Sequence, residues 1–144
     1  ARIDVKAENN LDLFGTETFN FDKSDVTETI GSAVAQAAKD LDIKVIVAAT
    51  SSGYTARMIS KYRPNADILA LTFDERTERG LMINWGVQPY VVDKPADTDE
   101  MFALAAKKAV ELGFAKSGDK IIVVAGVPMG TPGATNLMRV ETIK

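Results

Sequence analysis

The sequence contains neither cysteine nor histidine. Without cysteine there is no disulfide framework and no thiolate nucleophile, which fits a protein of a reducing cytoplasm. Without histidine the chain lacks the commonest general base and the commonest zinc ligand. No apolar stretch approaches the ~20 residues that span a bilayer, and no secretory signal stands at the start. We therefore expect a cytoplasmic protein with no membrane partner.

The chain also has little net charge. Its 144 residues carry a formal charge of −3, so it lacks the basic surplus that nucleic-acid binders usually show. Hydrophobic residues make up 46% and charged residues 26% of the sequence, a composition typical of an ordinary globular domain. We expect one domain with a sizeable core and no nucleic-acid partner.

Helical and strand-like segments alternate along the chain. Asp25–Glu28 resembles a capping box at the start of a helix, and Gly113 stands where a later helix should end. Apolar periodicity predicts helices over about 25–41, 53–63, 75–84 and 97–112. Near-continuous apolar runs, typical of buried strands, predict strands at 44–49, 67–73, 90–92, 120–125 and 137–143, with Pro89 breaking the chain before the third.

This order predicts an α/β fold: three layers, α/β/α, around a mostly parallel five-stranded sheet. Only the loop 126–135 separates the last two strands, which is too short for a parallel crossover, so the last strand should be antiparallel. Residues 1–23 are irregular, and we interpret them as a connecting arm. Residues 24–144 then form the α/β domain.

The loop that follows the first strand has the features of a phosphate-binding loop. Backbone N–H groups at a helix N-terminus have no intrahelical partner, and the helix dipole favours an anion there. Glycine allows close approach of the backbone, and hydroxyls add hydrogen bonds. The alternative is an ordinary serine-capped turn, since the segment is no Walker loop. The candidate residues are Thr50, Ser51, Ser52, Gly53, Tyr54 and Thr55.

Two further loops should leave the same edge of the sheet, where ligands bind in such folds. In the first, Arg76 and Arg79 have side chains that can pair with a phosphate, although local pairing with Glu75 and Glu78 is the more favoured interpretation. The second is rich in glycine and proline and can either close over an anion or simply connect two strands. Its candidate residues are Gly126, Pro128, Gly130, Gly133 and Thr135.

No segment suggests a catalytic centre. The sequence has no metalloprotease motif, no nucleophile elbow and no general base with a visible partner. Asp74 and Glu75 at a strand end are possible metal ligands, but acidic residues in a turn usually face water. On the residues alone we expect an anion-binding α/β domain without catalytic residues and without a metal or cofactor of its own.

Three segments together carry a family resemblance: 25–64, 67–92 and 118–140. One combines a strand, hydroxyls, a glycine and a helix ending in Tyr-Arg-Pro. Another has a Gly-Pro loop ending in Thr-Asn-Leu-Met. Both resemble the C-terminal regulatory domain of bacterial pyruvate kinase, and the resemblance covers nearly the whole chain from about residue 25 onward.

The resemblance implies a function for the whole protein. Pyruvate kinase transfers phosphate from phosphoenolpyruvate to ADP with Mg²⁺ and usually K⁺, and its catalytic residues lie in a barrel that this chain lacks. The resemblance implies three partners: that barrel in the same polypeptide, further subunits of a tetramer contacted through the last strand, and a sugar phosphate effector. One effector phosphate would bind at Thr50–Thr55, with the loop Gly126–Thr135 closing over it.

The chain departs from the family where a second phosphate would bind. Well-studied members activated by fructose 1,6-bisphosphate use a tryptophan and an arginine in and around the helix after the fourth strand. The corresponding stretch here has Lys94, Lys107 and Lys108 but neither tryptophan nor arginine. The lysine ammonium is a single point charge and cannot bind a phosphate with the two parallel hydrogen bonds of a guanidinium. The effector therefore stays open: a bisphosphate, a nucleotide monophosphate such as AMP, ribose 5-phosphate, inorganic phosphate, or none. In the last case the domain would be a structural interface module with a vestigial phosphate loop.

Overall fold

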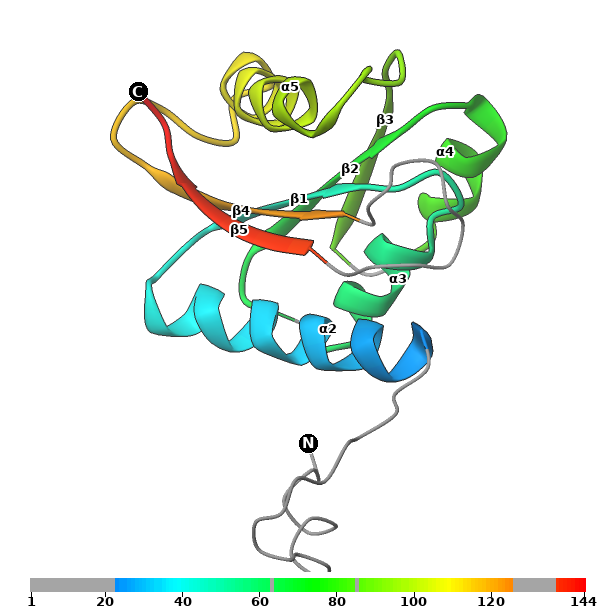
Figure 1. Cartoon of the computed structure of the whole chain (residues 1–144), viewed down its shortest axis with the longest axis horizontal. Helices are drawn as coiled ribbons and strands as arrows, with labels where there is room; N and C mark the ends of the chain where they lie inside the picture. Colours follow the sequence, from blue (N-terminus) through cyan, green and yellow to red (C-terminus); the bar gives the residue numbers. More distant parts are fainter. Residues whose placement is uncertain (1–22, 63, 85, 126–136) are drawn as a thin grey trace, which may run out of the picture.

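The computed structural model describes residues 23–62, 64–84, 86–125 and 137–144. Residues 1–22 of the predicted arm and the glycine- and proline-rich loop lie outside these ranges. Helices and strands alternate, as Figure 1 shows. The elements are α2 (Lys23–Asp40), β1 (Val45–Ala49), α3 (Tyr54–Lys61), β2 (Asp67–Thr72), α4 (Glu75–Leu81), β3 (Val87–Val91), α5 (Thr98–Glu111), β4 (Lys120–Ala125) and β5 (Leu137–Thr142).

The five strands form one sheet in the order β3-β2-β1-β4-β5. β1 runs parallel to both neighbours, with Ala48 opposite Ala70 on β2 and opposite Val124 on β4. β3 is parallel to β2, whereas β5 is antiparallel to β4. The predicted fold class is therefore confirmed, including the antiparallel last strand. The carboxyl ends of β1, β2 and β4 meet at one edge of the sheet.

Helices cover both faces of the sheet. In Figure 1, α5 lies above the sheet and α2 and α3 lie below it. Successive residues of β1 point to opposite faces of the sheet. Val45 and Val47 pack in the hydrophobic cluster under α5. Ile46 and Ala48 pack in the cluster on the other face, which includes residues of α2 and α3 and Leu81 of α4. Both faces are buried, which explains why the strands are apolar throughout rather than alternating.

The third strand differs from its prediction. β3 spans Val87–Val91 and contains Pro89, which was expected to break the chain ahead of a strand at 90–92. The sheet order makes β3 an edge strand. Proline lacks an N–H, but an edge strand needs ladder bonds on one side only and therefore tolerates it. The prediction of a break was wrong because the position of a strand within the sheet is not visible locally.

Two helix boundaries also differ from their predictions. α2 begins at Lys23, two residues before the predicted cap Asp25. Aspartate is favourable both at the cap and in the first turn, so the pattern indicates the helix but not its first residue. α4 ends at Leu81 rather than near residue 84, because the N–H of Met82 bonds to the Arg79 carbonyl and tightens the chain into a turn.

A polar contact fixes α3 against α2. The Tyr62 hydroxyl donates to Glu28 Oε1 at 2.6 Å, and Lys61 Nζ lies 3.0 Å from Glu28 Oε2. The bond from Tyr62, followed by that from Lys61, lowers the pKa of Glu28, and the same carboxylate raises the pKa of Tyr62. Gly31 allows this approach, since a Cβ there would lie 3.0 Å from the Tyr62 ring. The contact holds the helix that carries the predicted phosphate loop.

Candidate anion-binding site

The loop between β1 and α3 is tied both to the neighbouring strand and to itself. The N–H of Thr50 donates to the Leu71 carbonyl of β2 at 3.0 Å. The Thr50 hydroxyl is buried and accepts the N–H of Gly53 at 2.8 Å. Thr50 therefore shapes the loop from inside.

Gly53 stands at the N-cap of α3 and is favoured there. Its φ of 88° lies in the left-handed region that side chains rarely adopt. A Cβ at this position would lie 3.1 Å from Arg57 Nη1 and 3.2 Å from Leu81 Cδ2. The loop favours glycine here, because a side chain would strain the left-handed backbone and would crowd Arg57 and Leu81.

The other candidate residues differ in exposure. Ser52 is exposed and its hydroxyl accepts the N–H of Tyr54 at 3.3 Å. Ser51 and Tyr54 are half-buried, and Thr55 is buried in the first turn of α3. Ser52 is thus the hydroxyl of this loop that is most open to a ligand from solvent.

Arg57 belongs to this site and was not among the predicted residues. Its guanidinium donates from Nη1 to the Ser52 carbonyl at 3.2 Å. It also approaches Gly80 of α4, where a built Cβ would lie 3.6 Å from Nη2. Helical side chains lean toward the N-terminus, so an arginine four residues after the cap Gly53 reaches that end of the helix. This spacing was the available signal in the sequence.

The N-terminus of α3 carries no acidic residue of its own. α3 has no side-chain cap bond and no acidic residue in its first turn. α4, by contrast, is capped by Asp74, which accepts the N–H of Thr77 at 2.8 Å, and α5 by Asp97, which accepts the N–H of Glu100 at 2.9 Å. The bond from Thr77 is the main cause that lowers the pKa of Asp74. An external anion would meet a like charge at α4 and α5 but not in the first turn of α3.

Two of the three predicted loops lie together. The Thr77 hydroxyl donates to the Ser51 carbonyl at 3.3 Å, which joins the start of α4 to the β1–α3 loop. Arg76 and Arg79 are exposed on α4, and Arg79 Nη1 lies 4.0 Å from Glu75 Oε1. The third loop, with Gly126, Pro128, Gly130, Gly133 and Thr135, lies outside the described residues.

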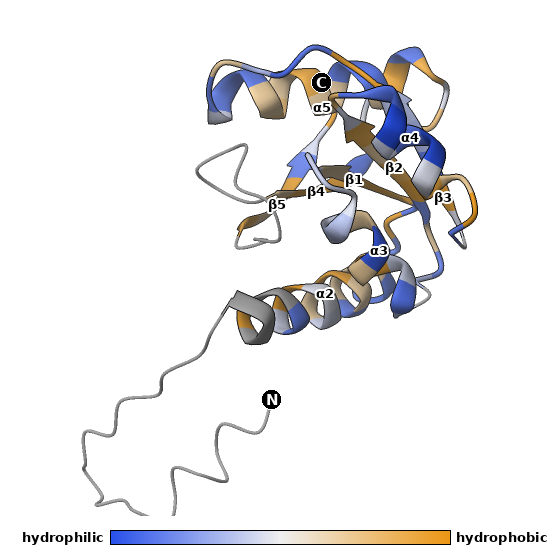
Figure 2. Cartoon of the chain, turned by 90° about the vertical axis from the view of Figure 1, so that its right-hand side faces the viewer, coloured by the Kyte–Doolittle hydropathy of each residue, from blue (hydrophilic) through white to orange (hydrophobic). Residues whose placement is uncertain are grey.

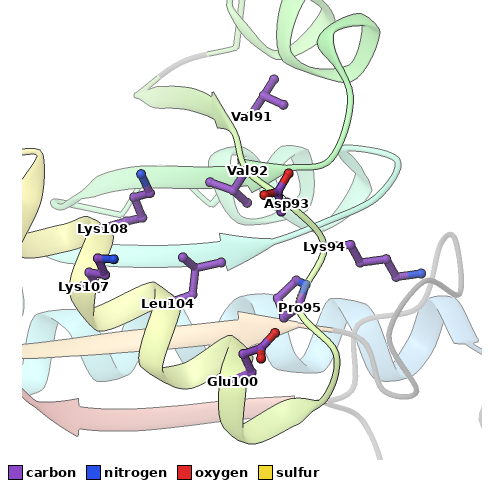
Figure 3. A pocket seen from close by; sticks show the side chains of 9 residues that line it. All are labelled: Val91, Val92, Asp93, Lys94, Pro95, Glu100, Leu104, Lys107 and Lys108. Atoms are coloured by element: carbon purple, nitrogen blue, oxygen red, sulfur yellow. The ribbon is translucent and has the colours of Figure 1, made fainter.

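Lys94, Lys107 and Lys108, which stand where the family resemblance implies a second phosphate site, line a separate open cavity of about 520 Å³ between the end of β3 and α5. They do not converge: Figure 3 shows Lys107 and Lys108 on α5 at one side and Lys94 pointing away at the other. Lys108 Nζ is also paired with Glu111 Oε1 at 2.8 Å. The other lining residues are Val91, Val92, Asp93, Pro95, Glu100 and Leu104.

Within the described residues, no group of three or more acidic side chains is arranged to hold a metal ion. None of the helices described is both long and apolar enough to cross a membrane. The site is thus a loop of hydroxyls and glycine at a helix N-terminus, with one arginine beside it. Such a site can bind a phosphate group, but it presents no nucleophile–base pair.

Comparison with known proteins gives consistent matches. The family model described as "Pyruvate kinase, alpha/beta domain" matches residues 28–141. Pyruvate kinase of Lactococcus lactis subsp. lactis is 55% identical over 100% of this chain and 29% of its own length. That of Lactobacillus delbrueckii subsp. bulgaricus is 54% identical over 98% of this chain and 25% of its own length.

A solved structure has the same fold. A crystal structure of a pyruvate kinase from Cryptosporidium parvum matches with a TM-score of 0.73 and 35% identity, covering 83% of this chain and 23% of that one. The chain spans about a quarter to a third of the length of the curated relatives it matches. It corresponds to their C-terminal domain, and it belongs to the pyruvate kinase α/β domain family.

Proposed function

We propose that this chain is the regulatory domain of a pyruvate kinase and that it binds a phosphorylated effector at Thr50–Thr55. The observation that carries the proposal is the N-terminus of α3, which has a glycine cap, no acidic residue in its first turn, and Arg57 beside it. Family membership supplies the context, because the relatives that the chain matches are pyruvate kinases.

The whole protein would transfer phosphate from phosphoenolpyruvate to ADP in the cytoplasm. The catalytic barrel, with its Mg²⁺ and K⁺, would belong to other parts of the same polypeptide, because the chain spans only about a quarter to a third of the length of its relatives. This chain alone would have no catalytic activity. Its role would be to shift the enzyme between states that differ in substrate affinity, which requires that the effector bind those states with different affinity.

The contacts support one phosphate position. A phosphate at the N-terminus of α3 would lie at the positive end of the helix dipole and would accept a hydrogen bond from the Ser52 hydroxyl. The Arg57 guanidinium has five N–H donors, of which one bonds to the Ser52 carbonyl. The loop Gly126–Thr135 would close over the ligand. Because Lys94 lies apart from Lys107 and Lys108, these three lysines do not converge on a position for a second phosphate. We therefore favour a sugar monophosphate or a nucleoside monophosphate over a bisphosphate.

The test is a titration of the full-length enzyme at subsaturating phosphoenolpyruvate. Ribose 5-phosphate, AMP, fructose 1,6-bisphosphate and inorganic phosphate are compared on the wild type, on the variant Ser52→Ala with Arg57→Gln, and on the control Arg76→Gln with Arg79→Gln. We expect one ligand to shift the substrate saturation curve, and we expect the first variant to lose that shift while the control keeps it. If no ligand shifts the curve, effector binding is wrong.

A second function is favoured by the other edge of the sheet. β5 is the last strand in the sheet order, Val140 on it is 39% exposed, and Arg139 Nε lies 2.6 Å from Glu141 Oε2. If a second copy paired antiparallel about a two-fold axis at Val140, each Arg139 would face the other copy's Glu141. The domain would then also assemble the tetramer.

Charge reversal tests this assembly. In sedimentation of the full-length enzyme, Arg139→Glu should weaken the tetramer, because it places two carboxylates opposite each other. Combining it with Glu141→Arg should restore assembly. If the single variant sediments like the wild type at low concentration, β5 is not the interface.

A further inference from the structure

A second open cavity, of about 440 Å³, lies between α5 and the C-terminal segment 139–144. Figures 1 and 2 both show the C-terminal end on the same side of the sheet as α5. The cavity is separate from the loop Thr50–Thr55, since no residue of that loop lines it. Its lining residues come from α5 and from the segment that begins in β5: Asp99, Phe102, Ala103, Ala106, Lys107, Val110, Arg139, Glu141, Thr142, Ile143 and Lys144.

Two contacts hold Arg139 in place at this cavity. Its Cζ lies 4.3 Å from the centroid of the Phe102 ring, and its Nε lies 2.6 Å from Glu141 Oε2. Phe102 is only 9% exposed and packs in the hydrophobic cluster under α5, so its ring is a fixed surface. An aromatic face attracts a guanidinium and orients it. The Arg139 guanidinium therefore has a defined position although its side chain is 52% exposed.

These contacts leave one edge of the guanidinium for a ligand. Arginine carries five N–H donors, and the atom nearest to Glu141 is Nε. Among the described residues, Arg139 has no second acidic partner. Glu141 Oε2 is buried and has no hydrogen bond of good geometry within the same ranges, so the attraction of opposite charges holds this pair. The edge formed by the two Nη groups can bind a carboxylate through two parallel hydrogen bonds.

The wall that α5 contributes to the cavity is apolar. Phe102, Ala106 and Val110 recur every four residues, which places them on one face of the helix. Val110 is 45% exposed, and Ala103 beside this face is exposed as well. Figure 2 shows hydrophilic and hydrophobic residues alternating along α5. A ligand held at Arg139 can therefore lie with an apolar body along this face.

The charges around the cavity favour a ligand with a single negative charge. Among the side chains that line it, the cationic ones outnumber the acidic ones by one: Arg139, Lys107 and Lys144 against Asp99 and Glu141. A phosphate dianion would exceed this surplus, and the Glu141 carboxylate beside Arg139 would repel it more strongly than a monoanion. A carboxylate matches both the surplus and the planar shape of the guanidinium.

We infer that the cavity between α5 and β5 binds a small aromatic carboxylate. The carboxylate pairs with the guanidinium of Arg139, and the aromatic ring of the ligand covers Ala106 and Val110. The volume of about 440 Å³ lies within the range of roughly 300–1,000 Å³ that small-molecule sites occupy. The inference does not rest on the proposed function, because the effector loop contributes nothing to this cavity.

Calorimetric titration of the full-length protein tests the site. Phenylacetate is the probe, and the neutral phenylacetamide is its matched control. We expect saturable binding of phenylacetate, at least about tenfold weaker binding of the amide, and at least about tenfold weaker binding of phenylacetate to Arg139→Gln. Arg79→Gln, which removes an exposed arginine from α4, should bind phenylacetate like the wild type. Absence of saturable binding, or equal binding of acid and amide by the wild type, would overturn the proposal.

Three further samples separate this site from the other proposals. Arg139 also belongs to the proposed β5 interface, so sedimentation accompanies each titration. The double variant Arg139→Glu with Glu141→Arg should assemble but lose phenylacetate, and wild-type affinity in it would overturn the site.

The variant Ser52→Ala with Arg57→Gln should bind phenylacetate like the wild type. Loss of binding in this variant would place the probe in the effector loop and overturn the cavity assignment. If sugar phosphates fail to shift substrate saturation while phenylacetate binds as expected, the proposed function is wrong and this site stands.

Discussion

The loops that leave β1 and β2 are neighbours in the sheet, and each leads into a helix, but they are built from different chemistry. The loop after β1 is shaped by the Thr50 hydroxyl and the left-handed Gly53, both uncharged. The loop after β2 is shaped by the Asp74 carboxylate, which caps α4. A hydrogen bond between Thr77 and Ser51 joins the two loops.

The difference shows how a helix N-terminus is kept available for a ligand. A carboxylate cap stabilises its helix by placing a negative charge against the dipole, but it also repels an incoming anion. A hydroxyl and a left-handed glycine lead the chain into α3 without that charge, whereas α4 starts from the extended Asp74. The loop after β1 accepts a weaker cap, and its helix keeps a positive N-terminus with Arg57 beside it.

A side chain at position 53 should lower the free energy of unfolding more than any other change considered. Gly53→Ala places a methyl group on a left-handed residue and crowds Arg57 and Leu81, so we expect a loss of about 3 kcal/mol in unfolding free energy. Gly113 has a similar φ of 81° with nothing within 4 Å of a built Cβ, so Gly113→Ala should cost only about 1 kcal/mol. Urea unfolding of both variants makes the comparison, and equal losses would show that crowding at Gly53 is unimportant.

Removing the internal hydroxyl should have the next largest effect. Thr50→Ala leaves the N–H of Gly53 without its acceptor inside the loop, and we expect a loss of about 2 kcal/mol together with weaker effector binding. Thr50→Ser keeps the hydroxyl and removes one buried methyl group, for a loss of about 0.8 kcal/mol. If the serine variant loses as much as the alanine variant, the hydroxyl does not support the loop.

Giving α3 an acidic first turn should make it resemble α4. Tyr54→Glu puts a carboxylate where α4 has Glu75, so effector affinity should fall about tenfold while the helix gains about 0.5 kcal/mol. Glu75→Gln, which removes the corresponding charge from α4, should leave effector affinity unchanged. Calorimetric titration of the full-length enzyme measures both. An unchanged affinity in Tyr54→Glu would mean that the anion does not bind at this N-terminus.

Most of the fold was predictable from the sequence because its signals are local. The apolar runs of β1, β2 and β4 and the short link before β5 gave the buried strands and the antiparallel end of the sheet. Pro89 was misjudged because the edge position of β3 depends on the order of all five strands.

The candidate site was predictable in part for the same reason. The hydroxyls and Gly53 stand in one continuous segment, so their proximity needs no tertiary information. Arg57 was missed because its position beside Ser52 depends on the direction of a helical side chain and on the small Gly80 of a different element. Contacts between elements, rather than residue types, decide which charges reach the loop.

The smallest expected effect is on the pH dependence of stability, which should differ between the loop after β2 and the loop after β1. The folded pKa of Asp74 lies below its ordinary value of 3.8, so its stabilising contribution is fully present above that value and is lost as pH falls through the folded pKa. Asp74→Asn keeps an acceptor but removes the charge, so the difference in urea midpoint between wild type and variant should be constant above pH 3.8 and should narrow as the pH falls below it. The difference between wild type and Thr50→Ala should stay constant, because a hydroxyl does not titrate in this range. A constant Asp74→Asn difference would mean that the charge of Asp74 does not stabilise α4, and the contrast between the two loops would then be one of shape alone.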